Sequence, residues 1–168
     1  KWLQHKKVVA LGEIGLDFHY DFSPRDIQRE VFKKQLKICE NITKPVIIHS
    51  REASQEVFDI IKDSKVRKGV VHAYSGSLEM ALEYIKLGFY IGVGGVLTFK
   101  NANKLINVVE NIPLEYILIE TDAPYLAPVP VRGTRNNSQN LKYVVEKIAE
   151  IKQIEVEKVE KIILETTK

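Results

Sequence analysis

The sequence has little of several features that mark specialised proteins. Its 168 residues include one cysteine, Cys39, which excludes a disulfide within the chain and favours a reducing, cytoplasmic location. Lys and Arg number 25 and Asp and Glu 22, and a net charge of +3 does not predict strong nonspecific binding to duplex nucleic acid. No apolar run is long enough to span a bilayer, and no secretion leader stands at the start. We therefore expect no membrane association.

Short apolar runs alternate with amphipathic stretches along the chain. The runs are rich in β-branched residues and mostly do not alternate with polar residues, which is typical of strands buried on both faces. The expected strands are residues 8–11, 46–48, 70–71, 89–93 and 116–119. This order predicts an α/β fold with a parallel sheet, in a single domain over residues 1–168. Five such strands suit either an open doubly wound sheet or part of a (β/α)8 barrel.

The first expected helix begins after Ser23-Pro24, an N-cap residue followed by proline at the first helical position. It extends to about Asn41. Its apolar face is expected to use Ile27, Val31 and Ile38, and this face would pack on the sheet.

Four of the five expected strands end on a residue that can bind a metal or move a proton. Glu13, His49, His72 and Asp122 stand at or shortly after these ends. In a parallel α/β fold the carboxyl ends of all strands share one face, and that face carries the active site. The four side chains are therefore expected to meet at one mouth.

Two imidazoles and two carboxylates form a mixed nitrogen and oxygen ligand set, which suits Zn, Mn or Fe, and Mg through the oxygens. A metal there would activate a bound water, and Asp122 could take the proton from it. Each residue alone has a plainer interpretation: a single histidine is more often a hydrogen-bonded rim or core residue, and Asp122 could be a helix N-cap, since Pro124 follows. One shared geometry explains all four together.

Three arginines are candidates for binding phosphate. Arg51 follows His49 and either holds a phosphate through a bidentate contact or pairs with Glu52 or Glu56. Arg132 and Arg135 lie in the long loop 123–140, where they either clamp a phosphate backbone or stay solvated.

Four stretches of the sequence together resemble the TatD family of metal-dependent deoxyribonucleases, which is similar to the amidohydrolases. The resemblance runs over essentially the whole chain, in the order of the family. The matching stretches are Val9-Ala10-Leu11-Gly12-Glu13-Ile14-Gly15-Leu16-Asp17, Pro45-Val46-Ile47-Ile48-His49-Ser50-Arg51-Glu52-Ala53, Val71-His72-Ala73-Tyr74-Ser75-Gly76, and Ile119-Glu120-Thr121-Asp122-Ala123-Pro124-Tyr125-Leu126-Ala127-Pro128.

The resemblance implies a (β/α)8 TIM-barrel-type fold around one or two divalent cations. It implies that Glu13, His49, His72 and Asp122 are metal ligands and that Asp122 is the proton acceptor. It also implies hydrolysis of phosphodiester bonds in DNA, often from the 3′ end, with RNA as a substrate of some members. Another amidohydrolase-like hydrolase would use the same ligands on amides or phosphate esters.

The sequence departs from the family in lacking the His-x-His strand that opens its members. What is present corresponds to about the last five βα units of the barrel. We therefore expect weak metal binding and little turnover from these residues alone, and self-association through unpaired strand edges. The third alternative is a catalytically inactive fragment that acts only by association.

Overall fold

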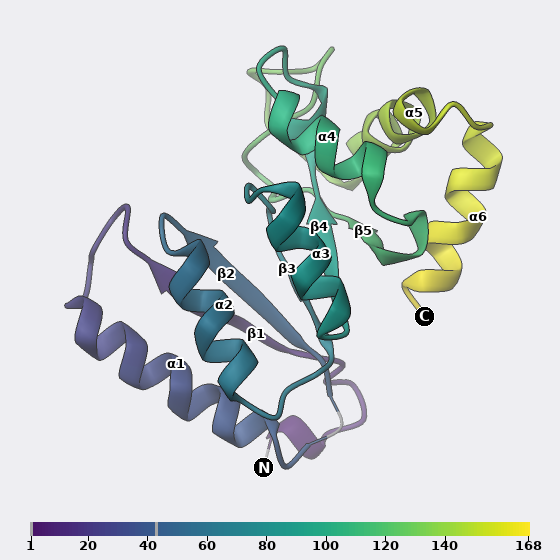
Figure 1. The fold of residues 1–168 in the computed structure, drawn as a ribbon. Helices are drawn as coiled ribbons and strands as arrows, with labels where there is room; N and C mark the ends of the chain where they lie inside the picture. The colour runs from purple at the N-terminus through teal and green to yellow at the C-terminus, as the bar shows by residue number, and fades with distance from the viewer. Residues whose placement is uncertain (1, 43) are drawn as a thin grey trace. The chain divides into compact units, whose positions relative to one another are not determined.

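The computed structural model describes residues 2–42 and 44–168 and divides into two compact units (Figure 1). The first unit extends to His72 and includes Lys86–Phe89, and the second comprises Ala73–Ile85 and Tyr90–Lys168. The expectation of a single domain over residues 1–168 stays a prediction. Within the described ranges, every helix is too short or too polar to cross a membrane.

The first unit is a parallel sheet with helices packed on it. β2 (Val46–Arg51) lies between β1 (Leu11–Asp17) and β3 (Gly69–Val71), and both pairings are parallel. α1 (Arg25–Cys39) packs on β1, and α2 (Ser54–Asp63) packs on β2 (Figure 1). A short 3-10 helix, η1 (Trp2–Gln4), precedes them. The alternation of strand and helix with parallel pairing confirms the predicted α/β class.

The second unit repeats the same alternation. β4 (Phe89–Val93), whose first residue belongs to the first unit, has the bounds expected from the sequence, and it pairs in parallel with β5 (Ile117–Ile119). Buried side chains of α5 (Leu141–Lys152), among them Val144 and Ile148, form part of its core. The other elements are α3 (Leu78–Lys86), η2 (Gly95–Thr98), α4 (Asn103–Asn111), η3 (Leu114–Tyr116), η4 (Ser138–Asn140), α5 (Leu141–Lys152) and α6 (Val156–Thr166).

The first strand differs from the expectation of residues 8–11. β1 begins at Leu11 and continues to Asp17, so Glu13 lies inside the strand rather than after it. The parallel ladder with β2 decides this, since it pairs Leu11 with Val46 and extends to Asp17 and Arg51. Glycines usually weaken a strand. Here the absence of a side chain at Gly15 lets the backbone of β1 lie close to the backbone of His49 in β2.

The core face of α1 also differs from the expectation. Ile27, Val31 and Ile38 are exposed. The buried side chains are Phe32, Leu36 and Cys39, at spacings of four and three residues. Both sets fit a helical period, and the packing of α1 on β1 buries the second set. The periodicity therefore predicted the helix correctly and its orientation wrongly.

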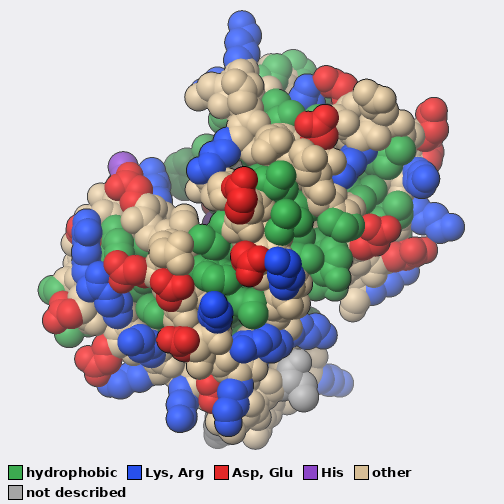
Figure 2. All heavy atoms as spheres, in the orientation of Figure 1, with side chains coloured by type: hydrophobic (Ala, Val, Ile, Leu, Met, Phe, Trp, Pro, Cys, Tyr) green, Lys and Arg blue, Asp and Glu red, His purple; other side chains and the backbone are tan. Residues whose placement is uncertain are grey.

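Charge is evenly spread on the face drawn in Figure 2. Basic and acidic side chains alternate there, and neither sign forms a continuous patch on that face. This agrees with the small net charge of +3.

Candidate metal centre

Three of the four expected ligands come from neighbouring strands of the first unit. Glu13 lies in β1 and His49 in β2, while His72 directly follows β3. The backbone N–H of His72 donates to the carbonyl of Ile48 at 2.9 Å, which extends the β2–β3 ladder by one residue and sets His72 beside His49. Parallel pairing thus brings residues 59 positions apart to one side of the sheet.

The donor atoms of these three residues are close enough to share one cation. One ligand atom from each of Glu13, His49 and His72 lies within 4.8 Å of the others. The Glu13 carboxylate lies between the two rings, with Oε2 at 3.3 Å from His49 Nδ1 and Oε1 at 3.2 Å from His72 Nε2. One carboxylate and two imidazoles fit a divalent cation of the Zn or Mn type. Both rings are partly buried, and the carboxylate is open to solvent.

Asp17 holds His49 from the other side of the ring. Its Oδ2 lies 3.0 Å from His49 Nε2, while Oδ1 accepts the backbone N–H groups of His19 and Tyr20, each at 3.0 Å. Burial opposes ionisation of Asp17, but the hydrogen bonds from Tyr20, His49 and His19 outweigh it and lower its pKa. The ionised carboxylate favours a proton on Nε2, which leaves Nδ1 free to bind a metal beside Glu13.

Asp122 belongs to the second unit, and its role as fourth ligand and proton acceptor stays a prediction. It follows β5 with a positive φ of 55° and lines a cavity of about 110 Å³ together with Tyr74 and Glu120. Turns, not a helix, follow it as far as Ser138, so the helix N-cap interpretation is wrong. Glu120 accepts the backbone N–H of Ala73 through Oε1 at 2.6 Å.

The arginines lie on exposed positions in different surroundings. The Arg51 guanidinium lies 4.8 Å from the ring centroid of Tyr20, and that of Arg132 lies 4.1 Å from the ring centroid of Phe99. Arg135 is exposed in the long loop. Their roles in binding substrate stay predictions.

Buried Asn136, next to Arg135, organises the long loop, and the sequence analysis missed this role. Its Nδ2 donates to the carbonyls of Thr121 and Tyr125 at 2.7 and 2.8 Å, and its N–H donates to that of Pro124 at 3.0 Å. These bonds tie residues 121–125 to the arginine-bearing part of the loop. Only its place in the run Arg135-Asn136-Asn137 hinted at this, because asparagine often bonds backbone in turns.

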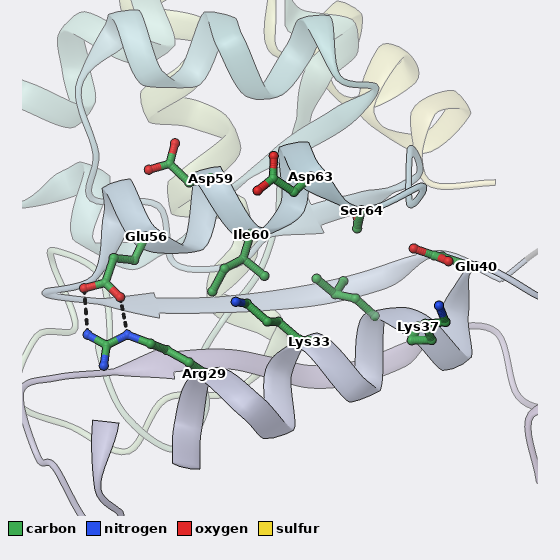
Figure 3. Close-up of a pocket in the computed structure, with 10 residues that line it drawn as sticks. Arg29, Lys33, Lys37, Glu40, Glu56, Asp59, Ile60, Asp63 and Ser64 are labelled. Carbon is green, nitrogen blue, oxygen red and sulfur yellow. Dashed lines mark hydrogen bonds and ion pairs between the residues drawn. The ribbon is translucent and has the colours of Figure 1, made fainter. Parts of the chain in front are cut away.

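A second hollow, of about 510 Å³, lies between α1 and α2 and is not the candidate centre. In Figure 3 Arg29 of α1 points toward Glu56 of α2, and the two form a bidentate ion pair that crosses it. Its lining contains none of the expected ligands: Arg29, Lys33, Leu36, Lys37, Glu40, Glu56, Asp59, Ile60, Asp63 and Ser64.

Comparison with known proteins decides the family. The sequence model described as "TatD related DNase" matches residues 1–168. The chain belongs to the TatD-related DNase family. It is 46% identical over 166 residues to the uncharacterized metal-dependent hydrolase YabD of Bacillus subtilis, which covers 98% of this chain and 65% of that protein. The uncharacterized metal-dependent hydrolase MJ1582 of Methanocaldococcus jannaschii is 41% identical over 161 residues, covering 96% of this chain and 61% of that protein.

Solved structures of TatD proteins share the fold. The crystal structure of YjjV, a TatD homolog from Escherichia coli, matches with a TM-score of 0.90 at 35% identity, over 96% of this chain and 63% of that one. A TatD family hydrolase from Entamoeba histolytica matches with a TM-score of 0.86 at 25% identity, over 96% of this chain and 62% of that one. This confirms the predicted TIM-barrel-type α/β class. The chain spans 61% to 65% of the lengths of these four relatives.

The hydrogen bond between Asp17 and His49 predicts a measurable effect on metal binding in this TatD-family chain. Replacing Asp17→Asn removes the charge that orients the ring, and we expect about a 10- to 100-fold loss of Mn²⁺ or Zn²⁺ affinity, measured by titration calorimetry. Asp21→Asn is the matched control, because the Asp21 carboxylate pairs with Arg25 rather than with a histidine. Equal affinity for Asp17→Asn and the wild type would show that the ring needs no such support.

Proposed function

We propose that this protein hydrolyses phosphodiester bonds of DNA with a divalent cation, Mg, Mn or Zn, held by Glu13, His49, His72 and Asp122. The observation that carries the proposal is the cluster of one carboxylate and two imidazoles, from β1, β2 and the residue after β3, with donor atoms within 4.8 Å. The description of the family as DNases supports DNA as the substrate. Digestion from the 3′ end and action in the cytoplasm are part of the same proposal.

Each residue has a part in this reaction. A bound divalent cation would supply the positive charge that polarises the phosphodiester and activates water. Glu13 would contribute the negative charge of the three-residue cluster, and His49 and His72 would hold the cation through ring nitrogens, with His49 oriented by Asp17. Asp122 accepts the proton of the attacking water. Arg51, Arg132 and Arg135 offset charge on the phosphates of the substrate.

Replacing Asp122→Asn tests the proposal. The amide keeps the shape of the side chain but cannot accept the proton, so we expect hydrolysis of labelled single-stranded DNA to slow by about 10²- to 10⁴-fold. The assay compares Mg²⁺, Mn²⁺ and Zn²⁺ in the full-length protein. Asp63→Asn, a charge-matched change at an exposed position of α2, is expected to leave the rate unchanged.

Two results would contradict the proposal. Equal rates for Asp122→Asn and the wild type would remove the proton-accepting role of Asp122. Hydrolysis of amide substrates without any cleavage of DNA would replace the nuclease by another amidohydrolase-like activity with the same ligands.

A further inference from the structure

Two aromatic side chains stand open to solvent in the segment that follows β1. Tyr20 is 53% exposed and Phe22 is 89% exposed. Their rings are stacked, with centroids 5.2 Å apart and planes 1° from parallel. Exposed aromatic rings lose the stabilisation that burial would give, and a pair open to solvent offers a face on which another molecule can stack.

An arginine adds positive charge to this pair. The Arg51 guanidinium lies over the Tyr20 ring, 4.8 Å from its centroid. The two carboxylates that the sequence offered as partners of Arg51 pair elsewhere, Glu52 with His19 at 2.7 Å and Glu56 with Arg29. Arg51 therefore stacks on an aromatic face while its charge is directed to solvent, an arrangement suited to a phosphate group.

The aromatic pair is tied to the candidate metal ligands by one carboxylate. Asp17 accepts the backbone N–H of Tyr20 through one oxygen and bonds His49 through the other. Arg25 further braces the segment, since it donates to the carbonyl of Phe18 at 3.2 Å and pairs with Asp21 at 2.8 Å. The backbone at Tyr20 is therefore tied through Asp17 to His49 of the candidate centre.

We propose that Tyr20 and Phe22 form a stacking shelf for an unpaired base of a single-stranded nucleic acid, with Arg51 contacting the phosphate of the same strand. The inference rests on the proposed nuclease function and names its substrate form. Stacking on aromatic rings needs a free base face, which a single strand offers and a duplex does not. Every base has such a face, so the shelf would act without strong sequence preference.

The test measures binding apart from cleavage. Anisotropy of a labelled ten-nucleotide single-stranded DNA is recorded with the full-length protein in chelator, where hydrolysis does not proceed. We expect Phe22→Ala and Tyr20→Ala each to weaken binding about 10-fold, while Phe22→Trp retains it. Val9→Ala, which truncates another exposed apolar side chain two residues before β1 begins, is expected to bind as the wild type does.

An abasic strand of the same length separates stacking from charge. We expect it to bind the wild type about as weakly as Phe22→Ala binds the normal strand, and Phe22→Ala to lose nothing further on it. Unchanged binding of the normal strand by both alanine variants, or equal binding of single strand and duplex by the wild type, would overturn the shelf. If binding depends on Phe22 but no metal supports cleavage, the shelf stands and the proposed function fails.

Discussion

Replacing Glu13→Gln is expected to weaken metal binding strongly and to slow hydrolysis with it. Glu13 is the one anionic donor of the three-residue cluster, and its two oxygens lie 3.3 and 3.2 Å from His49 and His72. Glutamine keeps the size of the side chain but removes the charge that attracts a cation. Replacing a residue that only hydrogen-bonds to a metal ligand lowers metal affinity about 10- to 100-fold. Loss of a direct ligand should therefore lower it at least about 100-fold. Titration calorimetry with Mn²⁺ or Zn²⁺ measures the loss.

Glu30→Gln is the control for this variant. Glu30 is an exposed carboxylate of α1 that pairs with Lys34, four residues along the same helix. The change of charge is the same, so metal affinity and cleavage should stay at the wild-type level. Wild-type metal affinity in Glu13→Gln would mean that the cluster of Glu13, His49 and His72 is not the binding site.

Replacing Gly15→Ala is expected to lower the free energy of unfolding by about 3 kcal/mol. A Cβ at position 15 would lie 1.8 Å from the carbonyl oxygen of His49, and the φ of 152° is one that alanine rarely adopts. Because Gly15 pairs with His49 in the β1–β2 ladder, the strands must separate where the candidate ligands are held. Urea denaturation in chelator measures the stability, and metal titration should show a parallel loss of affinity.

Gly133→Ala isolates the contribution of the backbone conformation. Gly133 also has a positive φ, of 89°, but no atom lies within 4 Å of where its Cβ would stand. Its replacement should therefore cost only about 1 kcal/mol, the conformational term alone. If both variants lost the same stability, the close approach of β1 to β2 would not be a constraint on position 15.

Local pattern in the sequence was sufficient for the order of elements. Unalternating β-branched runs separated by amphipathic stretches predicted parallel strands and helices, and the bounds of β4 agree with the prediction residue for residue. Local pattern could not orient α1, because Ile27, Val31 and Ile38 fit the helical period as well as Phe32, Leu36 and Cys39 do. Which set faces the sheet is decided by packing against β1, which the periodicity of the helix does not record.

The chain by itself determined the kinds of side chain available for a metal centre and the strands that carry them. Only tertiary structure decided which atoms meet. The pairing of β1 with β2, whose register shifts between Leu11 and Ile14, sets Glu13 between His49 and His72, and it brings Asp17 to the far nitrogen of His49. It also fixes the loop on which Tyr20 and Phe22 stack. Register is a property of paired strands far apart in the chain, so periodicity within either strand could not reveal it.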